Sequence, residues 1–173
     1  MSSQQIAVLL RGSDRRSIGR SNDVVKLILR VPSRFAELVQ CLWSDDPIVR
    51  MRAADATEKA SAVKPGLLKP CKAELLGLLA EAEQIELRWH LARIVPRLSL
   101  TQAERGRALE ALQLYLEDQS SIVRTFALQA LADLSRGEAG IRLRVREILE
   151  ESVATGTAAM KARARKLLRE LKS

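Results

Sequence analysis

The chain has one histidine, His90, and two cysteines, Cys41 and Cys71, so few side chains could form a catalytic or metal site. A serine or cysteine nucleophile needs a histidine base, and that base could only be His90. His90 stands inside a helical pattern, where packing is the simpler interpretation. One histidine and two distant cysteines provide no zinc-ligand spacing, and no glycine-rich phosphate loop occurs. The sequence therefore predicts no enzyme activity, no metal and no cofactor.

The two cysteines both stand among leucines, which favours buried free thiols over a disulfide. The apolar run at residues 6–10 is too short for a secretory signal. No segment approaches the roughly 20 apolar residues of a membrane span. We therefore expect a cytoplasmic protein that makes no membrane contact.

The net charge of +8 is concentrated at the two ends of the chain. Residues 1–31 hold six basic and two acidic side chains, and residues 155–173 hold six basic and one acidic. The residues between them are close to neutral, so the sequence shows no continuous phosphate-binding stripe. The cations of the last helix are interpreted first as a solvated end face, and alternatively as a nucleic-acid patch. They are Lys161, Arg163, Arg165, Lys166 and Arg169.

An internal repeat defines the elements that position these side chains. Four cations, Arg50, Arg88, Arg124 and Lys161, recur at spacings of 38, 36 and 37 residues. Each has an apolar residue just before it and mostly apolar residues three, seven and ten positions after it, which is the spacing of one helix face. The columns are Val49, Leu87, Val123 and Met160; Ala53, Leu91, Ala127 and Ala164; Thr57, Val95, Leu131 and Leu168; and Ala60, Leu98, Leu134 and Leu171.

A second helix follows the first in each repeat. Its core positions also recur at a spacing of 37: Cys71, Leu75 and Leu79; Ala108, Leu112 and Leu116; Val145, Leu149 and Val153. Asp46 before Pro47 predicts a capped helix start, Thr101 with Glu104 predicts a capping box, and Pro96 predicts a kink. With 47% hydrophobic but only 3% aromatic residues, the chain favours an all-α fold.

The repeat length, the apolar-Arg pair that opens the first helix and the Ala/Leu columns resemble bacterial HEAT repeats, including phycobilisome-lyase-type HEAT-like repeats. The resemblance extends over residues 22–171. It implies a right-handed α-α superhelix, a HEAT-like solenoid of about four helical hairpins. We expect a partly flexible N-terminal segment (1–20) before a repeat domain (21–173). The repeats are 21–44, 45–82, 83–118 and 119–154, followed by a terminal helix, 155–173.

In HEAT solenoids the second helices line the concave side, which implies a groove there. Counting about 100° per residue from the core positions gives the outward side chains. The candidate groove residues are Trp43, Leu114, Glu110, Glu117, Glu147, Lys69, Arg107 and Arg144. Because the ridge is small, apolar and acidic, it fits a peptide or helix of a protein partner better than a phosphate backbone.

The expected function is a non-catalytic protein-protein interaction scaffold, as a monomer or weak oligomer. The alternative is nucleic-acid binding through the basic terminal segments. Alkylation-repair glycosylases are similar in architecture only, because their cationic and aromatic concave face has no counterpart in this sequence. The four repeated cations are interpreted as contacts that stack one repeat on the next.

Overall fold

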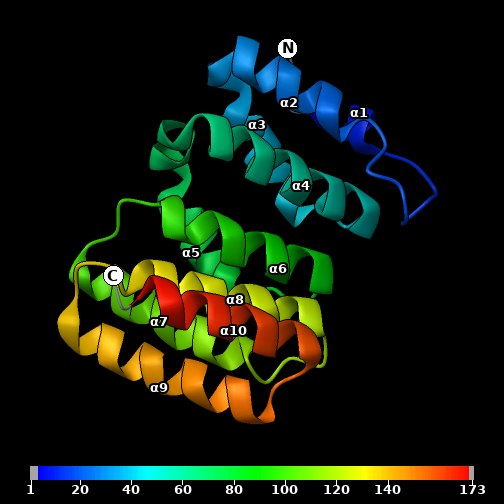
Figure 1. Ribbon diagram of the computed structural model, residues 1–173. Helices are drawn as coiled ribbons and strands as arrows, with labels where there is room; N and C mark the ends of the chain where they lie inside the picture. Colours follow the sequence, from blue (N-terminus) through cyan, green and yellow to red (C-terminus); the bar gives the residue numbers. More distant parts are fainter. Residues whose placement is uncertain (1–3, 172–173) are drawn as a thin grey trace. The chain divides into compact units, whose positions relative to one another are not determined.

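Residues 4–171 are the part of the chain that this computed structural model describes, and they form helices, turns and loops without a strand (Figure 1). The all-α prediction is confirmed. The chain divides into two compact units, Met1–Ser99 and Leu100–Ser173.

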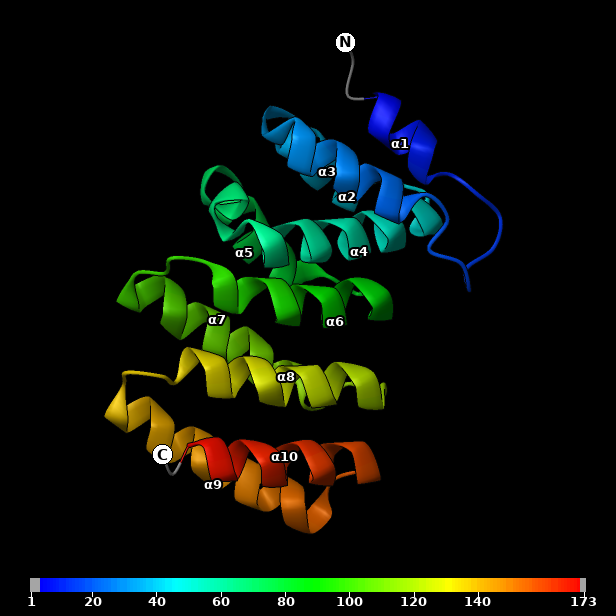
Figure 2. The ribbon, with the colours of Figure 1, turned by 45° about the horizontal axis from the view of Figure 1, so that its top comes forward.

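Residues 4–99 of the first unit form six α-helices and several 3-10 turns. The helices are α1 (Gln4–Leu10), α2 (Ser21–Arg30), α3 (Phe35–Gln40), α4 (Pro47–Val63), α5 (Lys72–Glu81) and α6 (Ile85–Ile94). The 3-10 segments are Pro32–Arg34, Cys41–Trp43, Pro65–Cys71 and Val95–Arg97. Helix α4 packs against both α2 and α6 (Figure 2). It begins as predicted, because Oδ1 of Asp46 accepts a hydrogen bond from the Ile48 amide at 2.8 Å and Pro47 occupies the first turn.

The second unit contains four helices: α7 (Gln102–Tyr115), α8 (Ser121–Leu134), α9 (Ala139–Thr155) and α10 (Ala158–Glu170). The predicted capping box opens α7, where the Glu104 amide donates to Thr101 Oγ1 at 3.2 Å and the Thr101 amide donates to Glu104 Oε2 at 2.8 Å. Helix α8 packs against α7, α9 and α10.

Burial follows the repeat columns. The first two columns are buried throughout, and the third and fourth are buried until the terminal helix, where Leu168 and Leu171 are partly exposed. In the second helices Leu75, Leu112 and Leu149 are fully buried. The spacing near 37 therefore reports a recurring core face in both units.

The prediction of a kink at Pro96 is wrong in detail. Helix α6 ends at Ile94, and Pro96 lies in the 3-10 turn Val95–Arg97. A proline has no amide hydrogen and its ring opposes a continuing α-helix, so the helix stops here instead of bending.

Both cysteines are free and buried, as predicted. Burial, aided by the nearby Glu37 carboxylate, raises the pKa of the Cys41 thiol to about 11. Burial and Glu74 also raise the pKa of Cys71. Both thiols are therefore protonated and weakly nucleophilic at neutral pH.

Helix α4 carries a charge into the core next to α6. The Glu58 side chain is only 7% exposed and lies within 3.1–3.3 Å of His90, Arg93 and Arg97. Arg97 also donates to the Glu58 carbonyl oxygen at 2.8 Å and to Ser61 Oγ at 2.9 Å. Burial alone would raise the pKa of Glu58, but the hydrogen bond with His90 and the two arginines outweigh it and hold that pKa below its ordinary value.

A second buried charge on α4 holds the N-terminal segment. Arg52 is 4% exposed and donates to backbone carbonyls of the segment that follows α1. The four acceptors are the carbonyl oxygens of Leu10 (3.1 Å), Arg11 (2.7 Å), Asp14 (3.1 Å) and Ser17 (3.0 Å). Ile6 and Leu10 of α1 are fully buried. The flexibility of residues 1–20 stays a prediction. Within residues 4–20, the hydrogen bonds from Arg52 and the burial of Ile6 and Leu10 attach the segment to the core.

We expect Glu58→Gln to lower the free energy of unfolding at pH 7 by about 2–3 kcal/mol. This loss is smaller than the one expected on breaking a wholly buried ion pair, because Arg93, one of the partners of Glu58, is partly exposed to solvent. A carboxylate whose pKa is lowered by folding stabilises the protein fully above its unfolded pKa, and that contribution is lost as the pH falls through the folded pKa. The difference between wild type and variant should therefore shrink below about pH 4.3. Urea unfolding at a series of pH values measures it, and a difference that stays constant down to pH 2 would contradict the assignment.

Candidate interaction surfaces

The side chains predicted to point outward from the second helices do so. Trp43 is 44% exposed and Leu114 is 70% exposed. The charged candidates are exposed as well: Lys69, Arg107, Glu110, Glu117, Arg144 and Glu147. Trp43 and Lys69 belong to the first unit and the other six to the second, so the two groups are treated as separate surfaces.

In the second unit, three of these six side chains line one hollow. Its volume is about 540 Å³, and Glu117, Arg144 and Glu147 stand on its wall with Glu151. Leu116, Ile148 and Met160 supply apolar surface to it. Leu114, Glu110 and Arg107 do not line the hollow, although they are exposed on the same helix, α7. Arg144 is held in place because its Nη2 donates to Gln113 Oε1 at 3.1 Å.

The hollow also contains Arg124, which the sequence assigned to repeat stacking. Its Nε is buried and has no hydrogen-bond partner among the described residues. The equivalent Arg50 in the first unit has partners: its Nε donates to Gln84 Oε1 at 2.8 Å and its Nη1 to the Ser44 carbonyl at 2.6 Å.

The residue that precedes the first helix of the next repeat accounts for the difference between Arg50 and Arg124. Gln84 precedes α6, and its long side chain reaches back to Arg50. The corresponding residue before α10 is Thr157, a shorter side chain whose Oγ1 already lies 2.8 Å from Ser121 Oγ. Among the other repeated cations, Arg88 donates to the Ala82 carbonyl at 2.6 Å and the Lys161 side chain forms no ion pair within residues 4–171.

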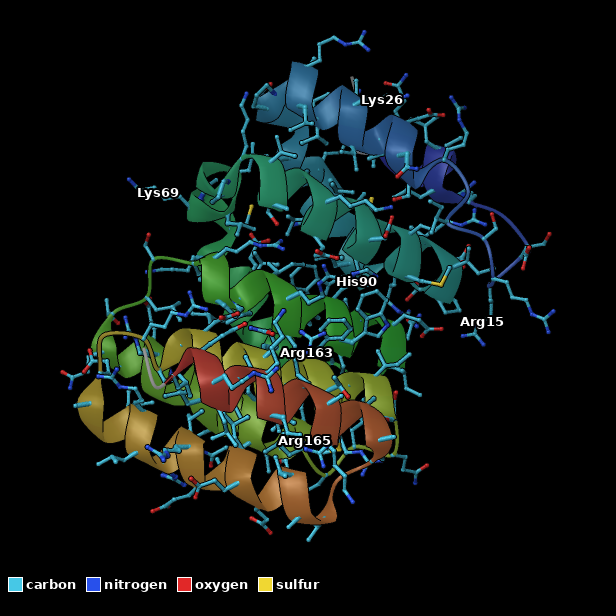
Figure 3. The ribbon with its side chains drawn as sticks, in the orientation of Figure 1. Arg15, Lys26, Lys69, His90, Arg163 and Arg165 are labelled. Carbon is cyan, nitrogen blue, oxygen red and sulfur yellow. The ribbon has the colours of Figure 1, made fainter. Side chains whose placement is uncertain are left out.

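The cations of α10 do not form one surface. Arg163 turns toward α8, where its guanidinium lies 5.7 Å from the Phe126 ring centre and Nη1 donates to Gln129 Oε1 at 2.7 Å (Figure 3). Lys166 lies 3.8 Å from the Glu170 carboxylate, one turn along the helix. Arg165 and Arg169 are exposed. The predicted patch is therefore reduced to two exposed arginines, Arg165 and Arg169, and the half-buried Lys161.

The sequence did not single out a smaller hollow between the start of α9 and the end of α10. It has a volume of about 280 Å³ and is lined by Leu143, Leu168 and Leu171 with Arg142 and Arg146. Leu143 is 66% exposed. A leucine outside the apolar columns of α9 was the only signal in the sequence, and single exposed leucines are common.

The described residues contain no group of three or more histidine, cysteine, aspartate or glutamate side chains suited to a metal ion. None of the described helices is long and apolar enough to cross a membrane. His90 is buried and stacks on Trp89, with ring centres 3.5 Å apart, so it does not face either hollow.

No known protein family matches the chain, and no curated protein matches it either. The chain is similar in fold to the crystal structure of an engineered protein from the Northeast Structural Genomics Consortium, with a TM-score of 0.62 and 20% identity. The match covers 98% of this chain and 79% of that one. At this identity the similarity concerns the fold alone.

The contrast between the two arginines gives a stability prediction. Arg50→Met should lower the free energy of unfolding by about 1.5–3 kcal/mol, since it removes charge-assisted hydrogen bonds from two carbonyls and a glutamine. Arg124→Met should change it by about 0.5 kcal/mol or less, because no such bond is lost. Thermal unfolding of both variants beside wild type measures this, and equal losses at the two sites would contradict the geometry.

Proposed function

We propose that the chain is a non-catalytic protein-binding module of HEAT-like helical repeats, in which the exposed side of the second helices receives a segment of a partner. The recurring buried columns and the alternation of first and second helices in both units support the repeat assignment. The observation that carries the binding role is the hollow of about 540 Å³ between α7 and α9.

The lining of the hollow defines the partner it fits. Three carboxylates, those of Glu117, Glu147 and Glu151, outnumber the guanidiniums of Arg124 and Arg144 in the lining, and they lie beside the apolar surface of Leu116 and Ile148. A segment that pairs an aliphatic side chain with lysines or arginines would bury the first and bring the second to the carboxylates. Because the walls of the hollow are helices that are already packed on a core, few residues of the module need to become ordered when a partner binds.

The first unit offers a second contact. Trp43 ends the 3-10 turn Cys41–Trp43, and its ring is 44% exposed. A partly exposed tryptophan on a rigid turn is a typical anchor for a partner because it buries a large apolar area at a low entropic cost.

Selection of peptides from a random displayed library tests the hollow. We expect the wild-type protein to enrich basic peptides that contain aliphatic residues. Glu147→Lys should lower the affinity for the selected peptides by about tenfold or more, since a carboxylate in the lining becomes a cation. Calorimetry or fluorescence anisotropy with the best peptide measures the change.

Glu150→Lys is the matched control, because Glu150 is exposed on the same helix, carries the same charge and does not line the hollow. It should leave the peptide affinity within about twofold of wild type. Failure to enrich any peptide, or equal losses in the two variants, would contradict the proposal. Trp43→Ala reports separately on the first unit.

A further inference from the structure

The loop between α1 and α2, together with the exposed face of α2, presents a group of cations without partners. Arg11, Arg15 and Arg16 on the loop and Lys26 and Arg30 on α2 are all exposed. None of their side chains forms an ion pair or hydrogen bond within residues 4–171. Figure 3 shows Arg15 on this loop, pointing away from the helices, and Lys26 on α2.

The loop is held from behind by Arg52. That guanidinium bonds four of the segment's carbonyl oxygens, which are thereby turned toward the core. Gly19 has a φ of +51°, which residues other than glycine rarely adopt. A Cβ at this position would lie 2.6 Å from Arg52 Cζ, so only a glycine lets the backbone come this close to the guanidinium. A Cβ on Gly12 would meet Arg52 as well. The loop arginines are therefore carried on an anchored backbone.

Charge and helix geometry extend this region along α2. Lys26 and Arg30 are four residues apart and so share one face of the helix. No side chain caps the amino end of α2, where the loop joins it, and the helix dipole adds positive potential there. Arg52 itself has no carboxylate partner among the described residues, so its charge is also uncompensated. Arg20 is already paired with Asp23 at 3.1 Å.

We infer that this loop and the face of α2 bind the phosphate backbone of a nucleic-acid duplex, with Arg52 as a positioning residue that does not itself touch phosphate. Arginine suits phosphate because its planar donors match two oxygens at once. No aromatic side chain occurs in residues 11–30, so there is no platform on which unpaired bases could stack. Backbone contacts of this kind are independent of base sequence. The inference does not rest on the proposed peptide-binding function.

Salt dependence of binding to labelled mixed-sequence 20-base-pair duplexes, one of DNA and one of RNA, tests the inference. With about four phosphate contacts, raising the salt fourfold should weaken wild-type binding about 100-fold. In the double variant Arg15→Gln/Arg16→Gln, the same fourfold rise in salt should weaken binding only about tenfold, because two phosphate contacts are gone. Arg165→Gln/Arg169→Gln on α10 removes the same charge from exposed arginines elsewhere and should keep the wild-type salt dependence.

The positioning role has its own readout. Gly19→Ala changes no charge but displaces the loop, so it should weaken binding several-fold while leaving the slope of affinity against salt unchanged. Arg52→Met should do the same, and Gly19→Ala keeps the test informative if Arg52→Met fails to fold. Thermal unfolding of each variant establishes that it is folded.

Three results would overturn the inference: no binding of either duplex at 25 mM salt, equal salt dependence in the Arg15/Arg16 double variant and wild type, or an equal loss in the α10 control. Stronger retention on anionic lipid vesicles than on either duplex would also overturn it in favour of a membrane surface. The peptide-binding test uses different variants and a different probe, so either proposal can fail without the other.

Discussion

A helix that is packed on both sides has little solvent-exposed surface on which to place its charged residues, and this constraint governs the first unit. Helix α4 lies between α2 and α6, and Arg52, Asp55 and Glu58 on it are all buried. A buried charge without partners costs several kcal/mol, so each must be matched by a neighbouring group, either on α4 itself or on an element packed against it. Carbonyl oxygens of the N-terminal segment match Arg52, Ser21 and Lys59 match Asp55, and α6 with its following turn matches Glu58.

The matching groups explain why distant segments meet where they do. The ends of α1 and of the loop after it are fixed by one guanidinium, and the register of α6 against α4 is fixed by His90, Arg93 and Arg97. Apolar columns alone would allow neighbouring helices to slide by a turn, since aliphatic contacts are similar at each step. Buried hydrogen bonds between specific atoms do not tolerate such a shift.

Periodicity in the sequence was sufficient to predict the helices of the repeats and the buried columns, because a core face must recur every three or four residues, but it did not predict α1. It also placed the outward side chains of the second helices, including Trp43, Leu114 and Glu147. It gave no role to Arg52, and it predicted packing for His90 without the contact to Glu58. Both occupy one column with Phe126. Side chains as different as these in equivalent positions indicate that the column makes different contacts in each repeat.

The repeated sequence also predicted more uniformity than the interactions show. Arg50 and Arg124 stand in the same column, yet Nε of Arg50 is hydrogen-bonded and Nε of Arg124 is not, because the reach of the following cap residue differs. Hollows of this kind arise where a repeat lacks one partner that its neighbours have, so they cannot be located from the columns.

The distribution of charge depends on the fold in the same way. Counting along the sequence places excess positive charge at both ends, but the fold treats the two ends differently. On α10, Arg163 turns toward α8 and bonds the neutral amide of Gln129, and Lys166 lies 3.8 Å from the Glu170 carboxylate, so fewer of these cations are available to a ligand. At the other end, the cation that is buried, Arg52, is bonded by carbonyl dipoles, which stabilise a guanidinium without cancelling its net charge. The carbonyls are drawn inward while the loop arginines remain outside, so the anchoring of this loop and its positive potential have one physical cause.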